Sequence, residues 1–376
     1  MPSLYFDFNA STPIHPEVQA SMQPLLNSLY GNPSSQHWAS DNAKSRLEHA
    51  RAQVASLIGA HTDEIIFTSG GTESNNLALK GHFFNQLSRH PNPHIITQIT
   101  EHPSILSPLA FLEKLGATVT YLPVDQFGRV SPLDVSNAIT PNTTFISIMH
   151  ANNETGTIQP IEEIGYIAKQ NNICFHTDAA QSIGKVAIDI NQLNVDLLSI
   201  AGHKVYAPKG IGALYVRRGT MLEPINHGAG HENGLRAGTE SLLLATALGL
   251  ACEIAQTQNK NADIRQLRDN FWQQLVDLYG DQVLLNGHET HRLPNTLNVG
   301  FKHQQGADLL GKLSGVAAST GSACHEGQAT LSPVLSAMNV DSSYGLGAIR
   351  FSLGLGVTQQ DINLVIQKLK HILPSN

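Results

Sequence analysis

The chain between residues 145 and 181 reads FISIMHANNETGTIQPIEEIGYIAKQNNICFHTDAAQ. Two of its runs, Phe145–Met149 and Ile173–Thr177, are rich in β-branched and aromatic residues and predict buried strands. Between them, Ile161–Gln170 alternates apolar and charged residues in the pattern of an amphipathic helix. A strand, a helix and a second strand in this order predict a crossover unit with two parallel strands.

The same alternation extends along the chain in both directions. Five more strands are predicted, at Ile65–Thr68, His94–Ile99, Thr118–Leu122, Asp196–Ile200 and Gly212–Val216. Helical patterns at Glu73–Ser88 and Ile105–Leu115 lie between the earlier ones. The chain therefore predicts an α/β fold with a largely parallel sheet flanked by helices. A long polar helix, Gln256–Tyr279, then changes the character of the sequence and places a domain boundary near residue 254.

Composition excludes several classes of protein. With 376 residues, 41% of them hydrophobic and 14% charged, the chain can build a sizeable core and is not of a disordered type. Its net charge of −7 disfavours nucleic-acid binding. The three cysteines cannot form a disulfide framework, which indicates a reducing compartment. The N-terminus shows no secretory signal pattern, and the longest apolar stretch, Leu242–Ala255, is too short to cross a bilayer. We expect a soluble, cytoplasmic protein that binds neither nucleic acid nor membranes.

Polar clusters follow five of the predicted strands. They are Ser69–Thr72, Glu101–His102, His150–Glu154, Asp178–Gln181 and Gly202–Lys204. Ordinary turns explain any one of them, but turns favour Gly, Asp, Asn and Ser over His, Gln and Lys. Because ligands bind beyond the carboxyl ends of parallel strands, we expect the five clusters to converge on one site.

The segment Ser69-Gly70-Gly71-Thr72 is typical of a phosphate cradle. Gly71 lets the main chain approach a ligand, the helix that follows directs free N–H groups at it, and the Thr72 hydroxyl adds a donor. A simple helix cap gives a similar pattern, so this motif alone is weak.

Lys204 and Asp178 indicate the cofactor. A lysine at a strand end facing a pocket can lose its proton and form an imine, while a nearby aspartate can hold a pyridinium nitrogen. Together with the cradle they describe a site for pyridoxal 5′-phosphate. His102 can stack on the cofactor ring or be a histidine satisfied near the core. Lys209 competes with Lys204 as the imine residue, although its turn sequence is typical of a solvated lysine.

At these residues the chain resembles the NifS/IscS-like cysteine desulfurases, members of the class V aminotransferase group of fold-type I pyridoxal-phosphate enzymes. The resemblance runs nearly end to end. It includes the segments YFDFNASTP, GNPSSQH, FTSGGTESNNLAL, TEHPSIL, ANNETGTIQPI, FHTDAAQSIGK, AGHKVYAPKGIGALYVRR, GAGHENGLRAGTES, STGSACHEG and IRFSLG. It implies a large cofactor-binding domain over residues 14–253, and a smaller α+β domain of residues 1–13 and 254–376.

The resemblance also implies roles for matching residues. Lys204 would form the imine with the cofactor, Asp178 would pair with the pyridine nitrogen, His102 would stack on the ring, and Gln181 would bind the ring oxygen. The phosphate would be held by Thr72 and Gly71 in the cradle, by His203, and by Thr239 of the other subunit of a homodimer. Asn153 and Arg350 would hold the substrate carboxylate, and Asn153 would also lie against the cofactor. No metal ligands are implied.

Cys324 would be the nucleophile that takes sulfur from the substrate. It lies in Ser319–Gly327, a segment of small residues with glycines on both sides, which is typical of a mobile loop. The neighbouring His325 can help to keep the thiolate populated. Cys174 and Cys252 instead lie in an apolar strand and helix, as buried structural cysteines do. The spacing of 26 residues between Cys324 and Arg350 (350 − 324) resembles the IscS-like subgroup.

The predicted function is therefore a desulfurase that converts L-cysteine to L-alanine and leaves a persulfide on Cys324, supplying sulfur for iron–sulfur clusters or other products. The alternative is a selenocysteine lyase, because Cys324-His325 followed by Ser332–Leu335 resembles that family too. A scaffold without catalysis is disfavoured by the intact motifs.

Three departures from the family pattern stand out. Ala201 replaces a serine that usually contacts the phosphate, and Ala229 replaces one glycine of a glycine-rich segment. The chain also ends soon after its last predicted helix, which leaves the docking of a sulfur-acceptor protein open.

Overall fold

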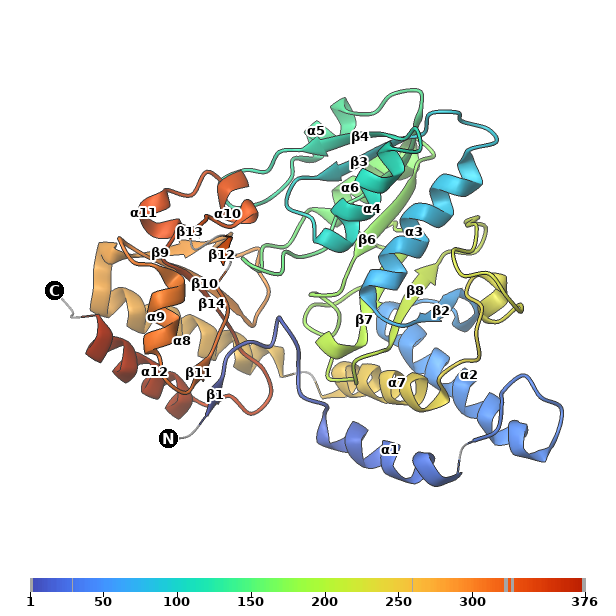
Figure 1. Cartoon of the computed structure of the whole chain (residues 1–376), viewed down its shortest axis with the longest axis horizontal. Coiled ribbons are helices and arrows are strands. Elements are labelled where there is room, and N and C mark those ends of the chain that lie inside the picture. Colours follow the sequence, from blue (N-terminus) through green and yellow to red (C-terminus); the bar gives the residue numbers. More distant parts are fainter. Residues whose placement is uncertain (1–2, 29, 259, 321–323, 326–327, 374–376) are drawn as a thin grey trace.

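The computed structural model describes residues 3–373 except 29, 259, 321–323 and 326–327, with the main chain only at 324–325 and 328–329 (Figure 1). A seven-stranded sheet has the order β2-β8-β7-β6-β5-β3-β4. Its strands are β2 (Ile65–Thr68), β3 (His94–Gln98), β4 (Thr118–Leu122), β5 (Thr143–Ser147), β6 (Cys174–Asp178), β7 (Leu197–Ala201) and β8 (Gly212–Val216). Only β8 runs antiparallel to its neighbours in this sheet. The predicted seven-stranded, mainly parallel sheet is confirmed.

Helices cover both faces of this sheet. They are α1 (Pro16–Ser28), α2 (Trp38–Ile58), α3 (Gly71–Gln86), α4 (Pro103–Glu113), α5 (Pro132–Asn137), α6 (Ile161–Gln170) and α7 (Leu242–Thr257). Successive strand residues face opposite layers: Leu197 packs with residues of α3 and α4, whereas Leu198 packs with residues of α2, α6 and α7. Burial on both faces explains why the strands are continuous apolar runs.

The small residues of α7 let it approach α2 closely. A Cβ atom on Gly249 would lie 2.6 Å from the Cα atom of Ala50. The apolar stretch noted in the sequence is therefore the inner helix of this layer. None of the helices formed by the described residues is both long enough and apolar enough to span a membrane.

The C-terminal part has its own core around an antiparallel sheet of order β14-β10-β9. Its elements are α8 (Asn261–Tyr279), β9 (Val283–Asn286), β10 (Thr296–Phe301), α9 (Gly306–Lys312), β11 (Val316–Ala317), β12 (Cys324–His325), β13 (Gln328–Ala329), α10 (Pro333–Ala337), α11 (Ser342–Gly345), β14 (Ala348–Ser352) and α12 (Gln359–Ile372). The N-terminal β1 (Leu4–Tyr5) pairs with β11, and Leu4 and Phe6 lie in the same core (Figure 1). The N-terminal strand β1 thus belongs to the C-terminal part of the fold.

The predicted helix Gln256–Tyr279 is wrong in its first turn. Gln256 and Thr257 end α7, Gln258 leaves the helical conformation (φ −112°, ψ 44°), and α8 begins at Asn261. The polar sequence across this break contains neither proline nor glycine, so the pattern did not show it. Ile254 belongs to the core of the large sheet and Ile264 packs against the other core. The division at residue 253 stays a prediction.

A buried ion pair fixes the segment between β8 and α7. The Arg51 guanidinium on α2 donates to both carboxylate oxygens of Glu232, at 2.7 and 2.8 Å. Glu232 also accepts a hydrogen bond from the Phe67 N–H of β2 at 2.7 Å, and its side chain is 1% exposed. Because a buried charge without its partner is costly, this pair anchors the segment that carries Thr239.

Replacing Glu232 with alanine should lower the free energy of unfolding by about 3–5 kcal/mol, because the Arg51 charge would stay buried without its counter-ion. Denaturant unfolding at fixed protein concentration measures this loss. Asp63→Ala is the matched control, because Asp63 pairs just as closely with Arg218 but both side chains are more than half exposed. Equal losses in the two variants would contradict the role of burial.

Candidate active site

A cavity of about 350 Å³ lies at the carboxyl ends of the sheet strands. Nine of the predicted site residues line it: Gly71, Thr72, His102, Asn153, Asp178, Gln181, His203, Lys204 and Arg350. All five polar clusters contribute to the cavity or its immediate wall, although His150 itself is buried. The structure therefore brings together residues spread over most of the chain.

The start of α3 forms one wall of the cavity. Gly70 has φ 152°, which glycine adopts easily, and Gly71 opens the helix. A Cβ atom on Gly71 would lie only 3.2 Å from the Cβ atom of Ala201, so the two segments are closely packed. The first amides of α3 have no partner within the helix, and Thr72 adds its hydroxyl. This donor set suits a phosphate group.

Asp178 is held by a chain of buried polar groups. Its carboxylate accepts hydrogen bonds from the Asn75 amide at 2.7 Å and from the Ala180 N–H at 2.9 Å. Asn75 also donates to the Ser104 hydroxyl at 2.8 Å, and that hydroxyl lies 2.8 Å from Nδ1 of His102. The predicted ring-stacking histidine and the predicted pyridinium partner are thus fixed by one network. Asn75 and Ser104 were not predicted as site residues, although both lie within the quoted segments FTSGGTESNNLAL and TEHPSIL.

Lys204 lies in a short 3₁₀ turn, Gly202–Lys204, directly after β7. Its ammonium donates to the carbonyl oxygens of Asn9 and Ala10, the latter at 2.8 Å. Burial, reinforced by the Arg350 charge, lowers the pKa of Lys204 to about 8. Lys209 is exposed and does not line this cavity. Of the two candidate lysines, only Lys204 lines the cavity, as an imine-forming amine must.

Cofactor-free protein should capture pyridoxal 5′-phosphate at a rate that rises with pH and levels off above about 8, because only the neutral amine attacks the aldehyde. A pKa of about 8 leaves roughly a tenth of Lys204 neutral at pH 7, several hundredfold more than the ordinary pKa of a lysine allows. Stopped-flow absorbance after mixing measures this rate. A rate that still climbs tenfold per unit between pH 9 and 10 would contradict the lowered pKa.

Two histidines of the cavity are held neutral. Burial and the charges of Lys204 and Lys209 lower the pKa of His203 to about 4. Burial also lowers the pKa of His102, against the opposing effect of the Asp178 charge. A neutral imidazole can donate from one nitrogen and accept at the other. His102 can therefore accept a proton near neutral pH, and His203 can donate to an anionic ligand without bringing a full charge.

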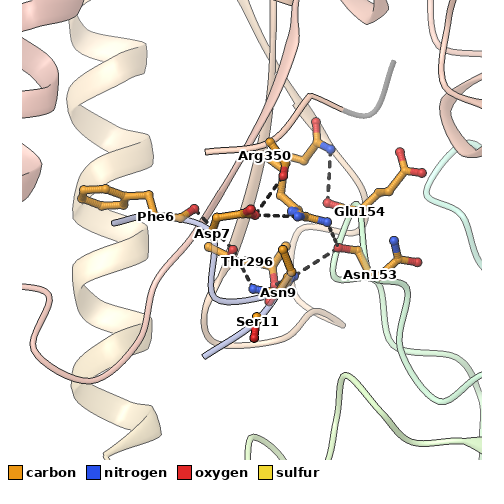
Figure 2. A network of polar contacts seen from close by, with 12 residues as sticks. Phe6, Asp7, Asn9, Ser11, Asn153, Glu154, Thr296 and Arg350 are labelled. Carbon is orange, nitrogen blue, oxygen red and sulfur yellow. Dashed lines mark hydrogen bonds and ion pairs between the residues drawn. The ribbon is translucent and has the colours of Figure 1, made fainter. Parts of the chain in front are cut away.

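Arg350 lies at the side of the cavity formed by the C-terminal part (Figure 2). Its guanidinium donates to the Asn153 carbonyl oxygen at 2.9 Å and to the Asp7 carboxylate at 2.7 Å. Figure 2 shows the Asn153 side chain pointing away from this guanidinium. The same carbonyl oxygen accepts from the Asn9 amide at 3.1 Å. Asp7 and Asn9 thus join Arg350 to the loop after β5, although neither was predicted as a site residue.

Thr239 does not line the cavity, and Cys324 cannot be placed relative to it from its main chain alone. Thr239 is exposed, on the segment anchored by Glu232. The main chain of Cys324 forms β12, which pairs with β13, but its side chain lies outside the described residues. Ser319, at the start of the cysteine segment, is bound to Arg350 through two main-chain hydrogen bonds and to Asp7 through its hydroxyl at 2.9 Å. The segment therefore begins beside the cavity.

The other two cysteines are free thiols with unreactive surroundings. Burial raises the pKa of Cys252 to about 12. Burial and the nearby Asp196 raise the pKa of Cys174 well above its ordinary value. Neither thiol forms thiolate readily, as expected for structural cysteines.

Comparison with known proteins gives consistent results. The aminotransferase class-V family model matches residues 4–365. A cysteine desulfurase IscS from Dictyoglomus turgidum is 46% identical over 374 residues, covering 98% of this chain and 94% of that protein. A solved NifS-like protein superposes with a TM-score of 0.91 at 36% identity, covering 98% of this chain and 99% of the other. A structure titled SspA in complex with cysteine superposes with a TM-score of 0.83 at 39% identity, covering 93% and 99%.

Proposed function

Since the chain belongs to the NifS/IscS-like cysteine desulfurases of the aminotransferase class-V family, we propose that it removes sulfur from L-cysteine and releases L-alanine. The observation that carries this proposal is the convergence of Lys204, Asp178, His102 and Arg350 on one cavity. An amine with a lowered pKa, a fixed carboxylate, a neutral imidazole and a guanidinium are the groups that this reaction requires.

The residues present fit pyridoxal 5′-phosphate. The start of α3 with Thr72 and His203 would hold its phosphate, Asp178 its ring nitrogen and Gln181 its ring oxygen, with Asn153 and the His102 ring beside it. Lys204 would hold it covalently. When bound, the cofactor supplies an electron sink for the pair released at the substrate Cα. Ala201 lines the same cavity and offers no hydroxyl, so the phosphate would be held by fewer donors than is usual in the family.

Side chains of the protein would bind the substrate, move the proton and take the sulfur. Arg350 has an Nε atom that is buried without a hydrogen-bond partner among the described residues, and this donor can bind the substrate carboxylate. Lys204 or His102 accepts the proton from Cα. The Cys324 thiolate then attacks the substrate sulfur: an S–S bond forms and the C–S bond breaks with its electron pair left on Cβ. Protonation of Cβ and return of a proton to Cα then give alanine. The persulfide on Cys324 passes its sulfur to an acceptor protein that is still unidentified.

L-Cysteine is favoured over selenocysteine because the curated relatives are named cysteine desulfurases and one similar solved structure contains cysteine. Selenocysteine lyase is the alternative. Sulfide and selenide release from the two amino acids by the same purified enzyme separates the two activities. Strong release of selenide with almost no sulfide would assign the lyase instead.

The working enzyme is proposed to be a homodimer in the cytoplasm, where thiol chemistry is possible. Thr239 is exposed in the single chain and would complete the phosphate site of the partner subunit. Mixing two inactive variants, Lys204→Ala and Thr239→Trp, should restore some activity through hybrid dimers. A monomer in sedimentation at the assay concentration would overturn this arrangement.

Asp178→Asn should bind the cofactor but lose turnover on the order of 10²-fold, because an amide cannot hold the ring nitrogen in its charged form as a carboxylate does. Steady-state alanine formation measures the loss, and the absorbance of bound cofactor confirms occupancy. Asn75→Asp is not a suitable control, because it would place a second carboxylate beside Asp178. Ser104→Ala is used instead to test the network that holds Asp178. Unchanged turnover in Asp178→Asn would remove Asp178 from the mechanism.

A further inference from the structure

Gln181 lies in the turn after β6, and its side-chain amide has two different partners. The Nε2 group donates to the Asn9 carbonyl oxygen at 3.0 Å. The Oε1 atom accepts from the Lys185 ammonium at 3.4 Å, and the same ammonium donates to the Gln181 main-chain oxygen at 2.9 Å. Lys185 therefore holds both oxygens of one residue.

These partners allow only one orientation of the amide. An ammonium has donors and no acceptor, whereas a carbonyl oxygen only accepts. Rotating the amide by half a turn would place Nε2 against the Lys185 ammonium and Oε1 against the Asn9 carbonyl, which gives two repulsive contacts in place of two attractive ones. The Lys185 charge thus determines the orientation of the amide, with Oε1 toward Lys185 and Nε2 toward the Asn9 carbonyl oxygen.

Lys185 lies outside the active-site cavity. Gln181 lines the active-site cavity, but Lys185 does not. Lys185 lines a separate cavity of about 60 Å³, with Lys204 in the wall between the two. Oε1 faces Lys185, whereas Nε2 bonds to Asn9, which lines the active-site cavity, so the donor end of the amide lies on the side of that cavity.

The charges that act on Lys185 come from Lys204, which forms part of the same wall, and from Arg350. Lys260 and the His15 imidazole also line the small cavity. No carboxylate belongs to the described residues that line this small cavity. Burial and the charges of Lys204 and Arg350 lower the pKa of Lys185 to about 7. The two oxygens of Gln181 are therefore the groups that stabilise the ammonium in this position.

We propose that Lys185, in its ammonium form, is a positioning residue that fixes the Gln181 amide so that it presents an N–H donor to the ring oxygen of the cofactor. The inference rests on the proposed function, in which Gln181 binds that ring oxygen. A fixed donor stabilises the negative charge on the ring oxygen and so lowers the proton affinity of the bound cofactor. The Lys185 charge also lowers the pKa of His203, so the part that passes through Gln181 has to be measured separately.

The test is a pH titration of the visible absorbance of the bound cofactor in the holoenzyme. In Lys185→Met the amide can rotate, so the titration midpoint should rise by about one pH unit, a tenfold change in proton affinity. Lys185→Arg keeps a cation and should restore most of the wild-type midpoint. Lys260→Met removes a lysine that lines the same small cavity without contacting Gln181, and should leave the midpoint unchanged.

A double-mutant cycle shows whether the effect passes through Gln181. Gln181→Met alone should raise the midpoint by a similar amount, and adding Lys185→Met to it should change little. If Lys185→Met shifts the midpoint equally in the wild-type and Gln181→Met backgrounds, the effect is a simple charge effect and the proposal is overturned. The absence of a shift in Lys185→Met alone would also overturn it. Lys185→Gln serves as a second neutral variant if Lys185→Met does not fold, as judged by circular dichroism. A wild-type protein without a visible band would instead overturn the proposed cofactor itself, and this inference with it.

Discussion

Cys324→Ser is expected to eliminate alanine formation from L-cysteine, a loss of at least about 10³-fold in kcat. A thiol is a poor leaving group, so sulfur departs only when a thiolate takes it, and a serine hydroxyl does not form that S–S bond. Substrate should still bind, because Lys204 and Arg350 are untouched. Coupled measurement of alanine, together with the absorbance change of bound cofactor on adding L-cysteine, separates the lost step from lost binding.

The other two cysteines provide the controls for this prediction. Cys174→Ala and Cys252→Ala should keep most of their activity, since burial keeps both thiols protonated. Mass spectrometry after one turnover should find the persulfide on Cys324 alone. Retained activity on L-cysteine in Cys324→Ser would end the persulfide mechanism. A selenol leaves more readily than a thiol, so activity that survives only with selenocysteine would point to the lyase.

Lys204→Ala should abolish both turnover and the covalent attachment of the cofactor. Lys204 is the amine of the cavity with a lowered pKa, and alanine removes the group that forms the imine and accepts the Cα proton. Treatment with borohydride followed by mass spectrometry should find no cofactor on the variant, while circular dichroism shows an intact fold. The loss of turnover should be on the order of 10³-fold or more.

Lys209→Ala is the matched control for this experiment. It removes a lysine five positions further along the chain that is exposed and does not line the cavity. We expect normal cofactor attachment and nearly normal turnover. The reverse result, with Lys204→Ala active and Lys209→Ala inactive, would reassign the imine.

The sequence predicted the large sheet well because its strands are buried on both faces. Each becomes a short apolar run, such as Leu197–Ala201, that local pattern alone can detect. The break between α7 and α8 was missed because the polar residues around Gln258 include neither proline nor glycine. Tertiary packing against two different cores, rather than a local signal, separates these helices.

The same contrast applies to the site. His102, Asp178 and Lys204 follow strands in recognisable motifs, so their convergence could be predicted. Asp7 and Asn9 could not, because they meet Arg350 and Lys204 only through the path of the whole chain. Lys185 was quoted within a motif, yet nothing in the sequence shows that its charge faces an amide oxygen.

The position of the N-terminal segment has a consequence for biosynthesis. Asp7 and its partner Arg350 are 343 residues apart, so the contact cannot form until almost the whole chain has left the ribosome. At typical synthesis rates this takes on the order of tens of seconds. During that time the large sheet and its helices can fold and Lys204 can bond to Asn9 and Ala10, but the cavity still lacks Arg350. The side of the cavity that would bind the substrate carboxylate is therefore completed after the side that holds Lys204.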